Sequence, residues 1–177
     1  MYVEVEFFTA DHVIRGFIDS PGERVSDILN IKHQTTLFLT DVEMSPLISV
    51  GRNTPTRFNQ AIVEKKTILF AIPVVKDMTH KSIYRRAVRK NFMIHLAMPN
   101  FLVDGTIHLT EALDIQKVFV VRPEDFIPIT DARAIYTLNP KIDLHAGTIV
   151  FNKNNVQLLG ERFSDEPTTT PRETPNP

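Results

Sequence analysis

The chain contains no cysteine among its 177 residues. This absence excludes disulfide bonds, thiolate metal ligands and a cysteine nucleophile, and it disfavours the small secreted domains that depend on disulfides. Only 6 glycines are present, and they form no glycine-rich loop that could cradle a phosphate. No Gly-x-Ser-x-Gly or His-Glu-x-x-His motif occurs, and the 6 histidines show no metal-ligand spacing. The sequence therefore predicts a protein without a catalytic, metal or cofactor site.

Long apolar runs and a strong imbalance of charge are also missing. No segment approaches the roughly 18 apolar residues that a membrane-spanning helix needs. The first residues lack the basic and apolar regions of a signal peptide, so we expect a cytoplasmic protein. The formal net charge is −1. Any electrostatic partner would therefore be recognised by a local patch rather than by the field of the whole molecule.

Short segments rich in apolar and β-branched residues follow one another along the chain and predict β-strands. In the N-terminal part they cover residues 3–8, 12–18, 37–50 and 67–75, with a helical turn at 24–30 and a loop at 51–60. In the C-terminal part they cover residues 91–109, 126–138 and 147–160, and no counterpart of the helical turn is recognisable. The predicted fold class is all-β.

Three blocks of sequence recur in the same order and predict a duplicated β domain. Gly16 aligns with Gly105 in the first block, and LFLTD at 37–41 matches IPITD at 127–131 in the second. TILF at 67–70 matches TIVF at 148–151 in the third. Asp41 and Asp131 then occupy equivalent positions, where each would satisfy backbone groups at a turn or bulge. The alternative is a single α+β domain with coincidental similarity between strands.

The duplication divides the chain into four predicted segments. Residues 1–76 form a first β domain, 77–91 a basic connector helix, 92–162 a second β domain and 163–177 a disordered tail. Each β domain is expected to be a five-stranded antiparallel sheet that bends round on itself. Domains of about 80 residues are near the lower limit for independent stability, so they would gain from packing on each other or on a partner.

This pattern resembles the Sm-like (LSm) small β-barrels, and is most similar to uncharacterised bacterial Sm-like domains. The resemblance rests on residues 13–18 with the central Gly16, on the long third strand after a variable loop, and on the ending TIVFNKNNVQLLG at 148–160. It implies two five-stranded Sm-like barrels in tandem. It also implies protein–protein association, because this fold family assembles through the edges of its strands.

The polar residues of the family's RNA motifs are matched only in part. Asp27 and Asn30 lie between the second and third predicted strands, but the methionine and the spacing of the first motif are absent. Asn152 and Asn155 lie in the turn that corresponds to the second motif, of which only the last asparagine is kept. The resemblance therefore implies the fold more directly than it implies RNA binding.

One cluster of charge stands out, and it is basic: Lys81, Arg85, Arg86, Arg89 and Lys90. Two interpretations remain open, the solvated face of a connector helix and a patch that binds the phosphates of RNA or of a nucleotide. We expect a non-catalytic scaffold that binds a protein partner or itself through strand edges. The alternative is an RNA- or nucleotide-binding module that uses the basic connector.

Overall fold

The structure is a computed structural model that describes residues 1–51, 54–74, 89–110 and 115–161. These residues are mostly β and form one ten-stranded sheet, all of whose strand pairs are antiparallel. The strands are β1 (Tyr2–Phe8), β2 (His12–Asp19), β3 (Thr36–Pro46), β4 (Thr56–Glu64), β5 (Phe70–Pro73), β6 (Arg89–Met98), β7 (Phe101–Thr110), β8 (Phe126–Tyr136), β9 (Asp143–Asn152) and β10 (Leu158–Glu161). The helical elements are α1 (Val25–Leu29), α2 (Val118–Val121) and the 3-10 turns η1 (Leu47–Ser49), η2 (Lys65–Thr67), η3 (Ile115–Lys117) and η4 (Lys153–Asn155).

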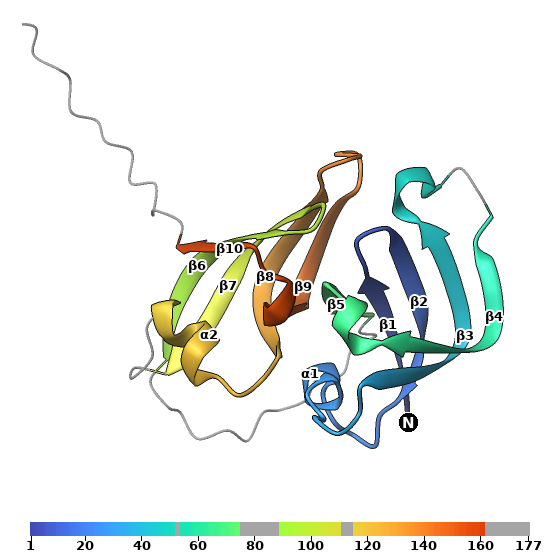
Figure 1. Ribbon diagram of the computed structural model, residues 1–177, viewed down its shortest axis with the longest axis horizontal. Helices are drawn as coiled ribbons and strands as arrows, with labels where there is room; N and C mark the ends of the chain where they lie inside the picture. The colour runs from blue at the N-terminus through green and yellow to red at the C-terminus, as the bar shows by residue number, and fades with distance from the viewer. Residues whose placement is uncertain (52–53, 75–88, 111–114, 162–177) are drawn as a thin grey trace, which may run out of the picture.

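The order of strands repeats across the sheet. In the N-terminal half, residues 1–74, the order is β5-β1-β2-β3-β4, and in the C-terminal half, residues 89–161, it is β10-β6-β7-β8-β9. The halves join where β5 pairs with β9, and they are drawn in blue to green and in yellow-green to red (Figure 1). The sheet is not closed, so β4 and β10 form its two ends. The all-β prediction is confirmed, whereas the two tandem five-stranded barrels stay a prediction.

Each half also contains the same bulge. The pairing register shifts around Gly16 in the N-terminal half and around Gly105 in the C-terminal half. A Cβ atom on Gly105 would lie only 2.8 Å from the Cδ1 atom of Ile129, so any larger residue there would have to displace that side chain. On the neighbouring strands Asp41 and Asp131 have φ angles of 48° and 49°, a left-handed conformation that aspartate tolerates better than most residues. Both aspartates therefore lie at equivalent bulges, whereas the hydrogen bonds that their side chains were expected to make with backbone groups stay a prediction.

Apolar side chains form two core clusters, and both contain residues from both halves. One cluster combines residues of β6 to β9 with Phe8 and Phe70 of the N-terminal half. The other combines the N-terminal strands and α1 with Phe126 and Val150 of the C-terminal half. Val5 and Phe7 of β1 belong to this second cluster, and Val3 packs against it, because alternate residues of a strand lie on the same face of the sheet. Neither half buries its core with its own residues alone.

Two predictions about the N-terminal half were wrong. The segment 51–60 was expected to be a loop, but residues 56–64 form β4, whose side chains are almost all exposed. The third repeat block was also misaligned, because Thr67 ends η2 and Phe70 begins β5, whereas residues 148–151 all lie in β9. Phe70 and Phe151, the last residues of the two blocks, are paired neighbours in the sheet rather than equivalent positions.

Predictions about the remaining segments have mixed outcomes. A counterpart of the helical turn at 24–30 does exist in the C-terminal half, where η3 and α2 lie between β7 and β8. Residues 77–88 of the predicted connector helix, 77–91, lie outside the described residues. Its last residues, 89–91, were wrongly assigned because they belong to β6. The predicted disordered tail, 163–177, also lies outside the described residues.

Candidate functional site

The junction between the halves, here called the seam, is a short antiparallel strand pair. Phe70 and Ala71 of β5 lie opposite Phe151 and Val150 of β9, and the backbone N–H of Asn152 donates to the carbonyl of Leu69 at 2.8 Å. Every residue of these two pairs is buried. The seam therefore extends one sheet through both halves and buries apolar side chains along both strands.

Aromatic rings fill the core next to the seam. The ring of Phe70 stacks on Phe8 with centroids 4.7 Å apart and meets the edge of Phe101 at 4.9 Å. Phe8 and Phe70 come from the N-terminal half, whereas Phe101 begins β7 in the C-terminal half. Such stacked and edge-to-face pairs contribute roughly 0.5–1.5 kcal/mol each beyond their burial. These contacts fix the halves against each other.

Two asparagines of the C-terminal half bind backbone groups of the N-terminal half. The buried side chain of Asn152 donates to the carbonyl of Ile68 at 3.1 Å and accepts from the N–H of Asn154 at 3.1 Å. Asn155 donates to the carbonyls of Lys66 at 3.1 Å and Ile68 at 2.9 Å. Both residues were predicted to lie in the turn that corresponds to the family's second RNA motif, of which only Asn155 is kept, and the side chains of both contact the seam.

Asn30 makes the reciprocal contact from the N-terminal half. Its Nδ2 atom donates to the carbonyl of Phe126 at 2.8 Å, and its Oδ1 atom accepts from the N–H groups of Asp125 and Phe126, both at 2.9 Å. Asn30 is also the C-cap of α1, where Nδ2 donates to the carbonyl of Ser26 at 2.8 Å. With Asn152 and Asn155 it forms a set of three amides, here called the amide clamp, that joins the halves.

A lysine binds the end of the short helix in each half. The buried Lys65 donates from Nζ to the carbonyls of Ile28 and Ile31, both at 3.1 Å. Lys153 occupies the same first position of the following 3-10 turn and donates to the carbonyl of Arg122, the C-cap of α2. Burial lowers the pKa of Lys65. Neither lysine was predicted as a site residue from the sequence, although Lys65 and Lys153 each directly follow the fourth strand of their half.

The outer edges of β4 and β10, here called the open edges, have no strand partner among the described residues. Apolar side chains are exposed on both. Ile62 of β4 is 69% exposed and lies opposite the exposed Phe38 of β3, and Leu158 of β10 is 55% exposed. Unpaired edges with apolar side chains are sites for the addition of another strand.

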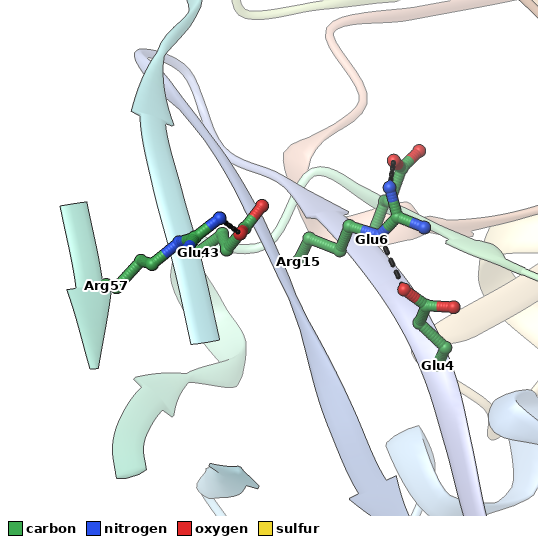
Figure 2. A network of polar contacts seen from close by, with 5 residues as sticks. All are labelled: Glu4, Glu6, Arg15, Glu43 and Arg57. Atoms are coloured by element: carbon green, nitrogen blue, oxygen red, sulfur yellow. Dashed lines mark hydrogen bonds and ion pairs between the residues drawn. The ribbon is translucent and has the colours of Figure 1, made fainter. Parts of the chain in front are cut away.

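Charged side chains cross the outer face of the N-terminal half in a ladder, shown in Figure 2. The Nε atom of Arg15 on β2 donates to Glu4 of β1 at 2.6 Å, and a second nitrogen of Arg15 lies 3.9 Å from Glu6. Farther along the ladder Arg57 of β4 lies 2.7 Å from Glu43 of β3. The carboxylates raise the pKa of Arg15, chiefly through the hydrogen bond that Arg15 donates to Glu4. These pairs satisfy one another and are exposed, so they hold strand register rather than form a reactive site.

The C-terminal half carries a corresponding ladder in which the positions of the acidic and basic residues are exchanged: Arg15 lies opposite Glu43 in the N-terminal half, and Asp104 lies opposite Arg133 in the C-terminal half. Arg133 of β8 donates to Asp143 of β9 through two bonds of 2.8 and 2.6 Å and holds the pKa of that carboxyl below its usual value. On the other side the ring of His95 lies 2.8 Å from Asp104 of β7. Asp104 of β7 takes the register position of Arg15 on β2. The two outer faces therefore present different charge patterns to any partner.

The remaining predicted site residues do not gather into one place. Of the basic run, Lys81, Arg85 and Arg86 lie outside the described residues, and Arg89 and Lys90 begin β6. Asp27 lies in α1 and accepts from the backbone N–H of residue 24 at 3.4 Å. A phosphate-binding helix face is therefore not observed in the part of the run that is described.

Two hollows open on the N-terminal half. One of about 460 Å³ is lined by residues of the β1–β2 turn, β3 and η2, together with Pro99 and Asn155 from the other half. A second of about 310 Å³ lies between α1 and the start of β3, next to Phe38.

Among the described residues no three His, Asp or Glu side chains lie close enough to hold a metal ion. Nothing in the described part of the chain indicates catalysis, and none of its helices is long and apolar enough to cross a membrane.

Comparison of the chain with protein-family models, with curated proteins and with solved structures finds no match.

Proposed function

We propose that the chain is a non-catalytic assembly module, built from two Sm-like units, in which β4 of one copy pairs with β10 of another. The observation that carries the proposal is the seam, where the equivalents of these two strands are already paired. In each half a 3-10 turn that begins at a lysine, Lys65 or Lys153, separates two strands. The strands before the turns, β4 and β9, are therefore equivalent, and so are the strands after them, β5 and β10. One strand of each kind is paired within the chain, and one of each kind is open.

The seam also supplies a register for the joint between copies. Val63 and Ile62 of β4 correspond to Phe151 and Val150, and Leu158 and the next residue of β10 correspond to Phe70 and Ala71. A joint with the register of the seam therefore places Val63 opposite Leu158 and Ile62 opposite Leu159. Such a joint is heterologous, so repeated joints give a ring if the rotation closes and a filament if it does not.

Exposure differs between the seam and the open edges in the way this proposal requires. Val150 is 1% exposed in the seam and its counterpart Ile62 is 69% exposed. Phe70 is fully buried and its counterpart Leu158 is 55% exposed. Covering each exposed side chain would contribute about 1–2 kcal/mol. The open edges thus carry apolar groups at positions that the seam buries.

Light scattering of the purified full chain at micromolar concentration tests the proposal. The wild type should have a mass that is an integer multiple, two or greater, of the chain mass. Ile62→Lys should shift the protein to monomers, because an edge lysine blocks strand addition. Ile48→Lys is the matched control, since Ile48 is 63% exposed in η1, at the other end of β3. A wild type that is monomeric at all concentrations would refute the proposal.

Disulfide formation tests the register. The chain has no cysteine, so Ile62→Cys with Leu159→Cys should give cross-linked multimers, because directly opposite residues have Cβ atoms about 4.5–5.5 Å apart. Phe58→Cys with Leu159→Cys is the off-register control, four residues away along β4. Equal cross-linking of the two pairs would contradict the proposed register.

A further inference from the structure

Two residues of the amide clamp, Asn152 and Asn30, have equivalent positions in the opposite half of the chain, next to the open edges, and these positions hold charged residues instead of amides. In the seam, Asn152 lies opposite Phe126 on the neighbouring strand, and Asn30 of the other half binds the backbone of Phe126. At the open edge of β4 the equivalent strand pair is Glu64 opposite Thr36. A carboxylate therefore stands at the open edge where the seam has an amide.

The residue that corresponds to Asn30 in the C-terminal half is Arg122. Asn30 is the C-cap of α1 and Arg122 is the C-cap of α2. The equivalence is supported by the two lysines. Lys65 binds carbonyls on either side of Asn30, and Lys153 binds the carbonyl of Arg122 itself. A guanidinium therefore stands where the seam has the second amide of the clamp.

We propose that Glu64 of one copy pairs with Arg122 of the next, so that an ion pair closes the joint between chains where amides close the seam. This inference rests on the proposed assembly function and adds what selects the partner. In the seam, Asn30 reaches the strand pair that contains Asn152, so a joint of the same geometry carries Arg122 to the strand pair that contains Glu64. The two replacements are complementary in charge, and this complementarity identifies the partner as a second copy.

Both side chains are available for this contact. The side chain of Glu64 is 50% exposed, and its ion pair with Lys66 is long, at 3.8 Å. The guanidinium of Arg122 donates to the carbonyl of His108 at 3.4 Å, which uses one of its five N–H groups. A planar guanidinium can bind a carboxylate through two parallel hydrogen bonds. An amide at either position could not give this selectivity, because it carries no charge.

Charge reversal tests the ion pair. In Glu64→Arg the joint would bring two guanidinium groups together, and in Arg122→Glu it would bring two carboxylates together. Each variant should therefore assemble about tenfold more weakly than the wild type, measured as the dissociation constant of the joint by sedimentation velocity. An equimolar mixture of the two variants should recover wild-type assembly, because every joint in an alternating array pairs opposite charges.

The mixture separates loss of a contact from loss of folding, because a misfolded variant cannot be rescued by the other. Lys141→Glu, which makes a similar charge change at the β8–β9 turn, is the control and should assemble as the wild type does. If both reversed variants assemble like the wild type, or if their mixture is no stronger than either alone, the ion pair is refuted while assembly through the edges stands. A monomeric wild type would refute both proposals.

Discussion

Truncation of Asn152 to alanine tests how much the amide clamp contributes to the fold. The side chain makes two well-formed hydrogen bonds, to the carbonyl of Ile68 and from the N–H of Asn154, both at 3.1 Å, and a longer one of 3.5 Å to the carbonyl of Lys65. Each bond of this kind contributes about 0.5–1.5 kcal/mol net. The carbonyl of Ile68 keeps its bond from Asn155 at 2.9 Å, which limits the loss. We therefore expect Asn152→Ala to lower the free energy of unfolding by about 1–3 kcal/mol.

Urea unfolding followed by circular dichroism measures this loss. With an m-value of about 2 kcal/mol per molar urea, the midpoint should fall by about 1 M. Asn154→Ala is the matched control, because Asn154 is exposed two residues away and should change the midpoint by little. Because both core clusters contain residues from both halves, each variant should still unfold in one transition. Equal midpoints for the two variants would show that the clamp adds nothing to stability.

Two further substitutions follow from buried groups. Lys65→Met should cost about 2 kcal/mol near neutral pH, because two carbonyls lose their donor. The pKa of Lys65 is lowered from 10.5 in the folded state, so the unfolded chain holds the proton more tightly. The wild type should therefore gain stability relative to Lys65→Met as the pH rises towards 10.5. A stability difference between the two proteins that stays constant over this pH window in urea titrations would contradict the assignment. Gly105→Ala should cost about 1–3 kcal/mol, because the new Cβ would lie 2.8 Å from Ile129. Gly147→Ala, whose Cβ would have no atom within 4 Å, should be neutral in the same measurement.

The sequence predicted those strands whose side chains alternate between core and solvent. Val5 and Phe7 are buried and flank the half-buried Glu6, and the helical turn at 24–30 is α1. The strand β4 was missed because all its side chains but those of Ala61 and Val63 are exposed. An edge strand packs on one side at most, so its sequence needs little alternation.

The sequence identified the three asparagines of the amide clamp as candidate residues but did not predict that they join the two halves. Asn30, Asn152 and Asn155 were singled out from their places in turns, but their partners lie 84 to 96 residues away. No local pattern reports a contact over such a separation. The block at 148–151 was misaligned with 67–70 for a related reason. Phe70 and Phe151 are paired neighbours, and two apolar strands that pair with each other can resemble each other in sequence as closely as two equivalent strands do.

The shared cores have a consequence for the order in which the chain can fold during its synthesis. The N-terminal half leaves the ribosome first, yet its core contains Phe126 and Val150. Until about residue 150 has been made, that half lacks part of its core and the strand beside β5. Its apolar surface therefore stays uncovered through most of translation, a period in which chaperones or aggregation compete with folding. Completion of the fold is then a late event that joins residues about 80 positions apart, and such long-range contacts form slowly.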